Sequence, residues 1–248
     1  MHDWIIPDWP APVHVKSLFT TRSGGVSGGK NGIYASLNLG MHVHDDPIAV
    51  ERNRALLRTY LPAEPKWLQQ VHGIEPVCIE HATAAIPQGD AALSRQPGRV
   101  CAIMVADCLP VFLCDRAGTV VAIAHAGWRG LVGGIIEQTI AAMQVDRGSL
   151  LAWLGPAIGP NHFEVGADVF EAFVQHDGIA AKAFVATRNK PEKKWLADIF
   201  LLARQRLEAS GVSAIYGGGI CTYSDAQRFF SYRRDGETGR MAALIWLE

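Results

Sequence analysis

The chain has 248 residues, of which 49% are hydrophobic and 19% are charged, and its formal net charge at pH 7 is −1. This length is enough to bury a sizeable core in one large domain or two small ones. A near-neutral chain has no basic surface of the kind that nucleic-acid-binding proteins use, so we expect no nucleic-acid partner. No apolar run approaches the roughly 20 residues of a membrane-spanning helix, so we expect no membrane partner.

Cysteine usage and the N-terminus indicate a reducing compartment. The five cysteines are odd in number and their spacing suggests no disulfide framework. The opening residues Met1-His2-Asp3-Trp4 lack the basic and apolar segments of a signal peptide. We therefore expect a cytoplasmic protein, either a monomer or a weak homodimer, whose thiols are free for metal binding or catalysis.

The first predicted elements are a strand and a glycine-rich loop. Residues 13–21 (VHVKSLFTT) alternate as a strand does, and the loop that follows begins with Arg22 and includes Gly24 and Gly25. Composition alone favours a mobile surface loop. Because an arginine beside glycine amides is also suited to holding an anion, the same loop is a candidate anion clamp.

Two histidines precede the first predicted helix. Asp45-Asp46-Pro47 places a carboxylate at the helix cap and a proline in the first turn, and the helix is expected to continue to Leu61. His42 and His44 stand just before it, at a spacing that would place both rings on one face of a strand. A metal-binding pair and a pair of ordinary surface residues are both consistent with this spacing, and surface residues are the commoner case.

A hairpin and a turn are predicted next. Residues 66–72 indicate a strand that ends at Gly73, and residues 75–81 indicate its partner. His72 would then lie at the end of a strand. Gly89-Asp90-Ala91 predicts a turn that enters a further short strand.

The segment from Val100 to Val132 is the one around which the rest of the chain is organised. It contains two apolar, strand-like runs, with Cys108 after the first and His125 at the end of the second. A glycine-rich bend at residues 126–130 leads into an amphipathic helix predicted for residues 131–143. Reactive side chains at the ends of buried strands are held rigidly, which is what a functional site requires.

The C-terminal half alternates predicted helices and strands. A polar, unpatterned segment extends to Pro191, and Gly211 is expected to stop the last long helix. We predict a single domain, residues 1–248, of the α/β class, with mixed β-sheets flanked by helices. The remaining predicted elements are a strand at 150–154, helices at 168–174 and 195–210, and closing strands around Ile215, at 229–232 and at 241–247.

His72, Cys108 and His125 together form a candidate metal site. Zinc prefers thiolate and imidazole ligands, and a catalytic zinc uses three protein ligands and keeps one position open. A different chemistry uses the same atoms without a metal, with Cys108 as nucleophile, His125 as its base and Asp107 or Asn161 orienting the ring. Three ordinary core residues remain a further alternative, because buried cysteines are common.

A series of motifs resembles the laccase-domain family, also called the YfiH-like or multicopper polyphenol oxidase family. The resemblance runs from about Phe19 to the C-terminus, with the motifs in order and sensibly spaced. Its motifs are TTRSGGVS at 20–27, SLNLG at 36–40, DDP at 45–47, QVHG at 70–73, GDA at 89–91, VADCLPV at 105–111, AHAGWRG at 124–130, GPAIGP at 155–160, FEVG at 163–166 and SYRRDGETGR at 231–240.

This resemblance implies a fold, a metal and several activities. The fold would be an α/β sandwich similar to cysteine-hydrolase-like toxins, and the zinc ligands would be His72, Cys108 and His125. Members are similar to purine nucleoside phosphorylases that act on adenosine, inosine and methylthioadenosine and also deaminate adenosine. The alternatives are an amidase that edits peptidoglycan precursors and a copper-dependent polyphenol oxidase, although only His42 and His44 have the His-x-His spacing of true laccases.

The implied reaction assigns roles to further residues. Phosphate would be bound by Arg22 with Gly24 and Gly25, or by Arg129, which has helix capping or a surface ion pair as its alternative role. Asn38 would hydrogen-bond ribose or base. Asp107 is the candidate acid or base, because neither His72 nor His125 begins the HxE motif of known zinc deaminases. One departure from the family pattern is His44, which stands where glycine is expected.

Overall fold

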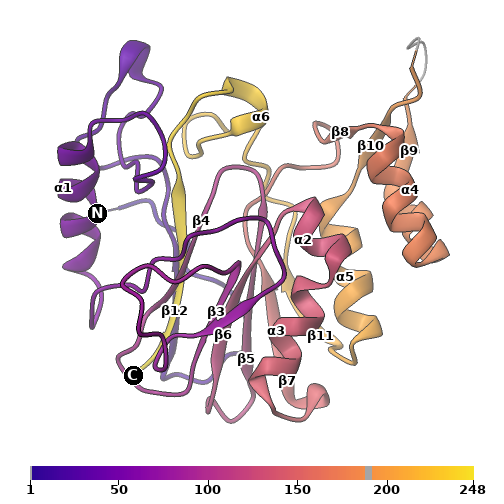
Figure 1. Ribbon diagram of the computed structural model, residues 1–248, viewed down its shortest axis with the longest axis horizontal. Helices are drawn as coiled ribbons and strands as arrows, with labels where there is room; N and C mark the ends of the chain where they lie inside the picture. The colour runs from indigo at the N-terminus through magenta and orange to yellow at the C-terminus, as the bar shows by residue number, and fades with distance from the viewer. Residues whose placement is uncertain (1, 188–191) are drawn as a thin grey trace.

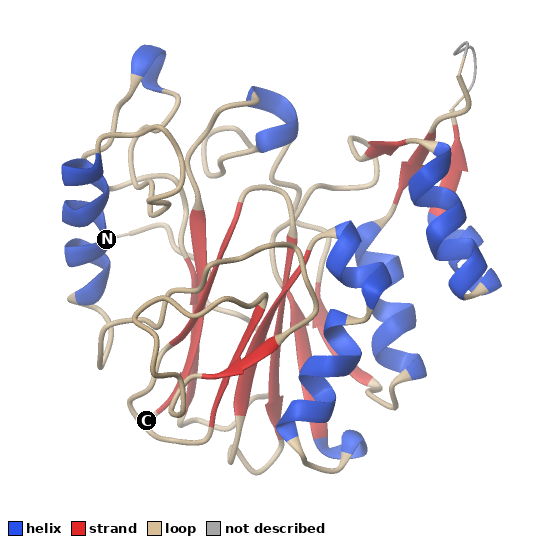
Figure 2. Cartoon of the chain, viewed as in Figure 1, coloured by secondary structure: helices blue, strands red, loops and turns tan. Residues whose placement is uncertain are grey.

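Two β-sheets pack face to face between helices in the computed structural model, which describes residues 2–187 and 192–248 (Figures 1 and 2). The smaller sheet has the order β1-β12-β4, and its strands are β1 (Val15–Phe19), β4 (Cys101–Val105) and β12 (Met241–Leu247). The larger sheet contains β2 (Pro76–Cys78), β3 (Ala91–Ser94), β5 (Leu109–Asp115), β6 (Val121–Ala126), β7 (Leu150–Leu154) and β11 (Ala214–Gly217). Its order is β11-β7-β5-β6-β3-β2, with parallel pairs at both edges and antiparallel pairs between them.

The helices cover the outer faces of the two sheets. Figure 1 shows α1 (Pro47–Arg58) beside the smaller sheet, and α2 (Trp128–Gly133), α3 (Ile135–Met143) and α5 (Ile199–Ala209) beside the larger one. A third, small sheet of β8 (Glu164–Val165), β10 (Trp195–Ala197) and β9 (Phe184–Ala186) lies next to α4 (Ala167–His176). The other short helices are α6 (Tyr232–Asp235), η1 (Lys30–Gly32), η2 (Arg147–Ser149) and η3 (Gly178–Ala183).

Successive side chains of a strand point to opposite faces of its sheet, and this alternation explains how the two sheets and α1 form layers. In β12 every residue is buried, because the two faces of the strand pack into different hydrophobic clusters. Met241, Ala243 and Ile245 pack into the cluster between the two sheets. The alternate residues Ala242, Leu244 and Trp246 pack into the cluster shared with α1. The predicted class, α/β with mixed sheets flanked by helices, is confirmed.

Several predicted elements have the expected places. The strand predicted at 13–21 is β1, and the strands at 150–154 and 241–247 are β7 and β12. The first helix begins as predicted, because the carboxylate of Asp46 accepts a hydrogen bond from the backbone N–H of Ile48 at 3.0 Å. It ends at Arg58 rather than at Leu61.

The hairpin predicted around Gly73 is wrong. Residues 66–72 form only isolated bridges, and β2 pairs in parallel with β3 instead of with that segment. The reason is local, since the backbone N–H groups of residues 71–73 donate to the side chain of Asp90 and not to a neighbouring strand. His72 therefore lies in a loop and not at the end of a strand.

Three further boundaries differ from the prediction. The helix predicted at 131–143 is split into α2 and α3 by Gly134, which has a left-handed φ of 105°. The helix predicted at 195–210 begins only at Ile199, because Asp198 caps it and residues 195–197 form β10. Residues 229–232 form no strand, since Ser231 caps α6. Residues 188–191, at the end of the predicted polar segment, lie outside the described residues.

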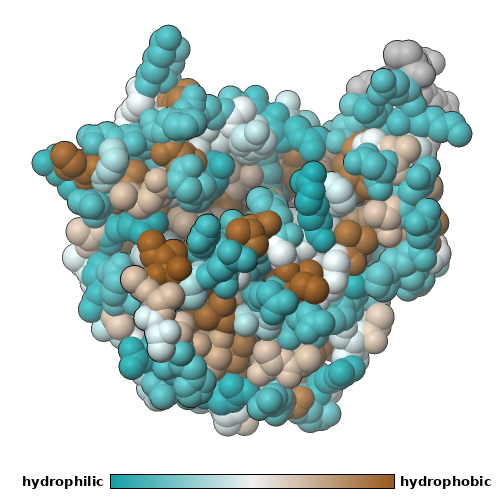
Figure 3. Space-filling model, viewed as in Figure 1, coloured by the Kyte–Doolittle hydropathy of each residue, from teal (hydrophilic) through white to brown (hydrophobic). Residues whose placement is uncertain are grey.

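Within the described residues, no helix combines the length and the apolar character that crossing a bilayer requires. The face shown in Figure 3 is mainly hydrophilic, and its hydrophobic residues lie in small separate groups. Scattered apolar residues of this kind are normal on a protein surface.

Replacement of Gly134 by alanine tests the break between α2 and α3. A Cβ there would be 3.5 Å from its nearest neighbour, an ordinary contact, so the cost comes only from the left-handed backbone. We expect Gly134→Ala to lower the free energy of unfolding by about 1–3 kcal/mol, measured by urea denaturation. Gly178→Ala is the control, because its φ is not positive and its Cβ would meet nothing. Equal stability of the two variants would contradict this explanation.

Candidate metal centre

Three ligand atoms from distant parts of the sequence converge at one end of the larger sheet. The donor atoms of His72, Cys108 and His125 all lie within 4.8 Å of one another. The Sγ of Cys108 is 3.9 Å from Nε2 of His72, and the two imidazole rings meet edge to face with centroids 4.8 Å apart. The cluster predicted from the sequence is therefore assembled, and among the described residues it is the one group of this kind.

Strand pairing brings two of the ligands together. In the antiparallel pair β5–β6, Pro110 is opposite His125 and Leu109 is opposite Ala126, so Cys108, just before β5, faces the chain just after β6. That neighbour is Gly127, and a Cβ there would lie 2.9 Å from Sγ of Cys108 and 3.2 Å from the ring of His72. Glycine at 127 is thus required by the site itself, because any side chain would enter the space between the ligands.

Asp90 orients His125. The Nδ1–H of His125 donates to Oδ1 of Asp90 at 2.8 Å, and both side chains are almost completely buried. This bond fixes the tautomer and leaves Nε2 as the free ligand atom of the ring. A carboxylate behind a histidine in this way is the usual second layer of a metal site, where it raises the basicity of the ligand.

Asp90 also holds the loop that carries His72. The backbone N–H groups of Val71, His72 and Gly73 donate to its carboxylate at 3.0, 3.0 and 2.7 Å. His72 has a left-handed φ of 58°, which is uncommon for a residue with a side chain. The three hydrogen bonds stabilise this conformation, so one carboxylate positions both histidines.

Asp107 holds the turn that presents Cys108. Its φ of 91° is unfavourable for a residue with a Cβ. The carboxylate accepts hydrogen bonds from the hydroxyls of Thr222 and Ser231 at 2.6 and 2.9 Å and from the backbone N–H of Arg233 at 2.7 Å. Asp107 is not among the residues that line the cavity around the cluster.

The electrostatics of the cluster favour a thiolate. Burial by itself raises the pKa of the Cys108 thiol, but attraction to His125 and hydrogen bonds from both histidines outweigh it and lower the pKa to about 6. Burial lowers the pKa of His125, but attraction to Cys108 and the bond to Asp90 raise it to about 9. Burial raises the pKa of Asp90, yet the hydrogen bonds from His125, Gly73 and Val71 keep this pKa below its usual range. The site thus contains a stabilised anionic sulfur.

The residues fit a single metal ion. Two imidazoles and one thiolate are the donor types that zinc prefers, and three protein ligands leave one position for substrate or water. All three donor atoms lie within 4.8 Å of one another, and the low pKa of Cys108 supplies a deprotonated sulfur. The raised pKa of His125 means that a metal ion would displace a proton from its ring. The same donors also occur in copper sites, so they indicate a metal without fixing its identity.

A cavity of about 860 Å³ opens beside the cluster. This volume is near the upper end of the range of about 300–1,000 Å³ typical of small-molecule sites. Polar groups in its wall include three arginines, Arg54, Arg129 and Arg240, and no aspartate or glutamate of the described residues lines it. The other wall residues include Met41, His42, Trp67, Leu68, Gln70, Ile86, Met104 and Tyr232.

Arg22 and its glycine-rich loop lie outside this cavity. The guanidinium of Arg22 donates to the carbonyls of Ala35 and Ala226 at 2.8 and 3.0 Å and covers the ring of Phe230. Gly25 packs against Ser36, and neither Gly24 nor Gly25 lines the cavity. The loop has a packing role in this structure, and its role as anion clamp stays a prediction.

Asn38 is buried behind the cavity wall. Its Oδ1 accepts the backbone N–H groups of Gly40 and Arg240 at 3.0 and 2.9 Å, and its Nδ2 donates to Asp45 at 2.9 Å. It therefore positions Arg240 and the loop that precedes α1. Contact with ribose or base stays a prediction that this geometry does not favour, since Asn38 does not line the cavity.

The two loop histidines do not act as a pair. His44 lies 3.0 Å from Glu237 and is exposed, whereas His42 lines the cavity. Neither belongs to the three-residue cluster. The predicted alternative of surface residues thus describes His44, while His42 belongs to the wall of the site.

Sequence reasoning missed Asp90, Arg54 and Arg240 as site residues. Asp90 stands out in the sequence only as part of a turn and of the GDA motif, and no role is evident there because its partners are 17 to 35 residues away. Arg54 lies on α1 and resembles a solvent-facing residue of an amphipathic helix. Arg240 lies in a charged segment, SYRRDGETGR, in which no spacing distinguishes it from the other arginines.

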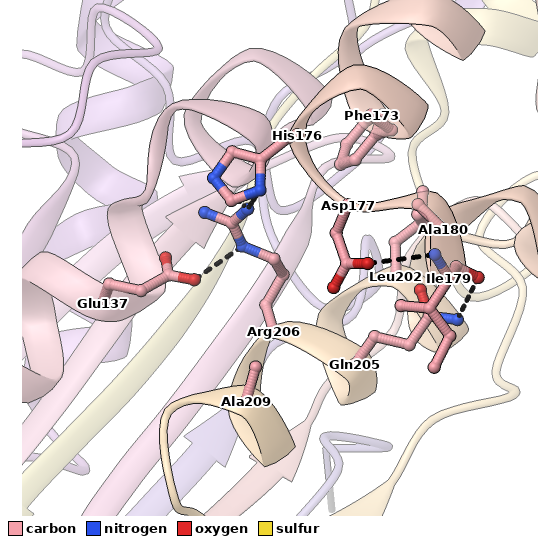
Figure 4. Close-up of a pocket in the computed structure, with 10 residues that line it drawn as sticks. All are labelled: Glu137, Phe173, His176, Asp177, Ile179, Ala180, Leu202, Gln205, Arg206 and Ala209. Atoms are coloured by element: carbon pink, nitrogen blue, oxygen red, sulfur yellow. Dashed lines mark hydrogen bonds and ion pairs between the residues drawn. The ribbon is translucent and has the colours of Figure 1, made fainter.

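A second, smaller cavity lies between α3, α4 and α5 (Figure 4). Its main charged pair is Arg206 and Glu137, joined at 2.6 Å, and Arg206 also contacts His176. These charges satisfy one another, and no cluster of metal ligands in the described residues lies there. The larger cavity is therefore the candidate functional site.

The fold and the cluster define an α/β protein with a candidate metal centre at the end of a mixed sheet. The sequence model of the family described as multi-copper polyphenol oxidoreductase laccase matches residues 16–248, so the chain belongs to this family. The purine nucleoside phosphorylase PA4543 of Pseudomonas aeruginosa is 52% identical over 248 residues, which is 100% of both chains. The purine nucleoside phosphorylase YfiH of Escherichia coli is 51% identical over 249 residues, again 100% of both.

Solved structures share the whole fold. The crystal structure of Neisseria meningitidis protein NMB0706 has a TM-score of 0.93 at 50% identity and covers 99% of each chain. YlmD from Geobacillus stearothermophilus has a TM-score of 0.83 at 31% identity, over 95% of this chain and 93% of its own. The expected resemblance to the laccase-domain family is confirmed.

Substitution of Asp90 by asparagine tests its role behind the ligands. We expect Asp90→Asn to weaken metal binding by about 10–100-fold, because it removes the negative charge behind His125 and replaces one of the two accepting oxygens by an N–H donor. Affinity is measured by titrating metal-free protein with zinc against a chromophoric chelator.

Asp115→Asn is the matched control. Asp115 is also buried and also accepts backbone N–H groups, those of Thr119 and Val120, but at the other end of β5. This variant should lose stability and keep its metal affinity. If both variants bind metal equally well, Asp90 is only a structural residue.

The pKa of Cys108 predicts its reactivity in metal-free protein. A pKa lowered to about 6 means that the thiolate is present above pH 6 and is lost as the pH falls through that value. Alkylation by iodoacetamide, followed by peptide mass spectrometry, should therefore be half-maximal near pH 6 for Cys108. Cys78, whose pKa is raised by burial and by Glu80, serves as control and should react only at alkaline pH. Identical profiles would refute the stabilised thiolate.

Proposed function

We propose that this protein is a cytoplasmic, zinc-dependent purine nucleoside phosphorylase. It would convert adenosine, inosine or methylthioadenosine and phosphate into the free base and ribose-1-phosphate. The observation that carries the proposal is the His-Cys-His cluster at the wall of a large cavity that contains three arginines and no carboxylate of the described residues. Such a cavity suits an anionic co-substrate, and the names of relatives about 50% identical support the same reaction.

His72, Cys108 and His125 would hold the zinc ion. When bound, zinc would supply Lewis acidity and a fixed positive charge beside the substrate. Asp90 keeps His125 in the tautomer that exposes Nε2, and it keeps the loop of His72 in place. Asp107 would hold the turn of Cys108. The proton transfer expected from the sequence is not assigned to it, because its oxygens already accept three hydrogen bonds.

Arg129 is the proposed phosphate-binding residue. It lines the cavity, and its guanidinium makes no hydrogen bond or ion pair with the residues that the structure describes, only a stacking contact on Trp128 at 4.4 Å. Its five N–H donors are thus available, and a guanidinium binds phosphate with two parallel hydrogen bonds. Arg129 follows closely after the end of β6 at Ala126, which keeps it near the His125 end of the site.

The reaction needs little proton chemistry from the protein. An oxygen of hydrogen phosphate forms a bond to C1′ as the bond from C1′ to N9 of the purine breaks. The electron pair of that bond passes to the base, which takes up the proton that phosphate gives up. Apolar wall residues such as Leu68, Ile86 and Met104 would exclude water and strengthen the electrostatic contacts inside the cavity.

Deamination of adenosine is the second activity that we propose for the same cavity. Water would replace the amino group at C6 of the purine and ammonia would leave, so adenosine would give inosine without phosphate. The product therefore distinguishes this activity from phosphorolysis. The family description names a copper oxidase, and the metal content of purified protein distinguishes zinc from copper.

Incubation of purified, metal-quantified protein with adenosine, with and without phosphate, tests the function. We expect adenine and ribose-1-phosphate only when phosphate is present, and inosine in either case if the protein also deaminates. Removal of the metal by a chelator should abolish turnover, and added zinc should restore it. No turnover of adenosine by zinc-loaded protein would refute the proposal and favour an amidase, whereas oxidation of phenols by copper-loaded protein would favour the oxidase.

Arg129→Gln tests the phosphate site in the same assay. We expect the KM for phosphate to rise about ten-fold or more, since a charge-assisted hydrogen bond is lost, with little change in zinc content. Arg116→Gln, an exposed arginine outside the cavity, removes the same charge and should leave the KM unchanged. Arg22→Ala in parallel decides whether the glycine-rich loop contributes.

A further inference from the structure

Three basic side chains of the cavity wall have no part in the proposed reaction. Arg54, Arg240 and His42 all line the cavity, and none of them is a ligand of the metal cluster. They lie near one another, since a Cβ on Gly40 would be 2.8 Å from Arg240 and 3.4 Å from His42. After burial, the charges of Arg240 and Arg54 are the next causes that lower the pKa of His42.

The two arginines are held firmly and keep donors free. Arg54 donates from Nε to the carbonyl of Leu39 at 2.9 Å and lies over the ring of Trp67 at 4.3 Å. Arg240 donates from Nη1 to the carbonyls of Thr238 and Gly239 at 2.8 and 3.0 Å. Among described partners, Nη1 of Arg54 and both Nε and Nη2 of Arg240 remain without a hydrogen bond, so a bound group can accept from them.

The two arginines have anionic neighbours but no ion-pair partner among the described residues. Glu64 raises the pKa of Arg54, and Cys108 and Asp107 raise that of Arg240, without outweighing burial. Neither Arg54 nor Arg240 forms an ion pair with a residue in the described ranges 2–187 and 192–248, and no acidic residue of those ranges lines the cavity. Burial lowers the pKa of both guanidiniums, which shows that their charge is partly desolvated. Partly buried cations without an ion-pair partner are costly, and a bound anion lowers that cost.

Arg54 and Arg129 reach the cavity from different sides, while Arg240 and His42 lie close enough to Cys108 and His125 for those charges to shift their pKa values. Arg54 comes from α1 and Arg129 from the first turn of α2, and Figure 1 shows these two helices on opposite sides of the paired sheets. The cavity volume of about 860 Å³ leaves space for a ligand that extends from one wall to the other. A phosphate co-substrate bound by Arg129 would therefore leave the second group of cations vacant for another anion.

We propose that His42, Arg54 and Arg240 form a second anion subsite, which binds an anionic group on the 5′ carbon of a purine nucleoside, such as the phosphate of a nucleoside 5′-monophosphate. The proposal rests on the phosphorylase function proposed above. The attacking phosphate is bound near C1′ of the ribose. A second, separate anion position would then reach the substituent on the 5′ carbon, at the other end of the ribose. Neutral nucleosides would use only part of the cavity.

The corresponding reaction is balanced with the same co-substrate. Adenosine 5′-monophosphate and hydrogen phosphate would yield adenine and ribose 1,5-bisphosphate. The bond from C1′ to N9 breaks, the bond from C1′ to the phosphate oxygen forms, and the base takes up the proton released by hydrogen phosphate. The 5′-phosphate is unchanged and serves only for binding.

Substrate competition and direct binding test the subsite in zinc-loaded protein. We expect adenosine 5′-monophosphate to bind more tightly than adenosine in isothermal titration at low salt, and to be phosphorolysed. In Arg54→Gln, the ratio of kcat/KM for the monophosphate to kcat/KM for adenosine should fall about ten-fold or more. Arg54→Lys, which keeps the charge, should lose less of this ratio. Arg52→Gln, an exposed arginine on the same helix, should keep it.

Three outcomes would overturn the subsite or separate it from the function. If adenosine is phosphorolysed but the monophosphate binds no more tightly, the subsite is wrong and the phosphorylase stands. If Arg54→Gln raises the KM for inorganic phosphate with both nucleosides, these cations bind the co-substrate instead, and the subsite is again wrong. If the monophosphate binds more tightly through Arg54 while adenosine is never phosphorolysed, the subsite stands and the proposed function fails.

Discussion

The carboxylate of Asp90 is the interaction on which the site depends. Buried and ionised, it would be costly without partners, and it receives four hydrogen bonds, three from the backbone of residues 71–73 and one from His125. These bonds join a loop to a strand that lies more than 50 residues later. Two of the three candidate ligands thereby share one anchor, so their distance is set by a single side chain and not by the length of the loop.

The third ligand is positioned by the sheets. Both faces of β5 and β6 are buried, which fixes their register, because a shift by one residue would reverse every side chain. That register places Cys108 opposite Gly127. Asp107, the strained residue before Cys108, is held by hydrogen bonds from Thr222 and Ser231. The thiolate is thus fixed by packing that extends through the core, whereas the histidines are fixed by hydrogen bonds around one carboxylate.

The sequence indicates most strands and the three ligands, because strand alternation and residue chemistry are local or nearly local signals. It fails where a side chain replaces a backbone partner. Residues 66–72 have the pattern of a strand, yet the backbone N–H groups of residues 71–73 donate to Asp90, and no spacing in the sequence reveals this. It also fails for Arg54 and Arg240, because their convergence depends on how α1 and β12 pack. Arg22, beside a conspicuous glycine-rich loop, is instead bound to backbone carbonyls.

The oxidase in the family description can be weighed against the residues of this chain. Two histidines and a cysteine suit a blue copper as well as a catalytic zinc, so the donor types do not decide between them. A multicopper oxidase also needs further copper sites to pass electrons to oxygen, and the described residues contain one cluster, with His42 and His44 facing different partners. One metal ion in a cavity whose arginines form no ion pair with a described residue would instead suit group transfer, in which a metal polarises a substrate and the cations hold its anions.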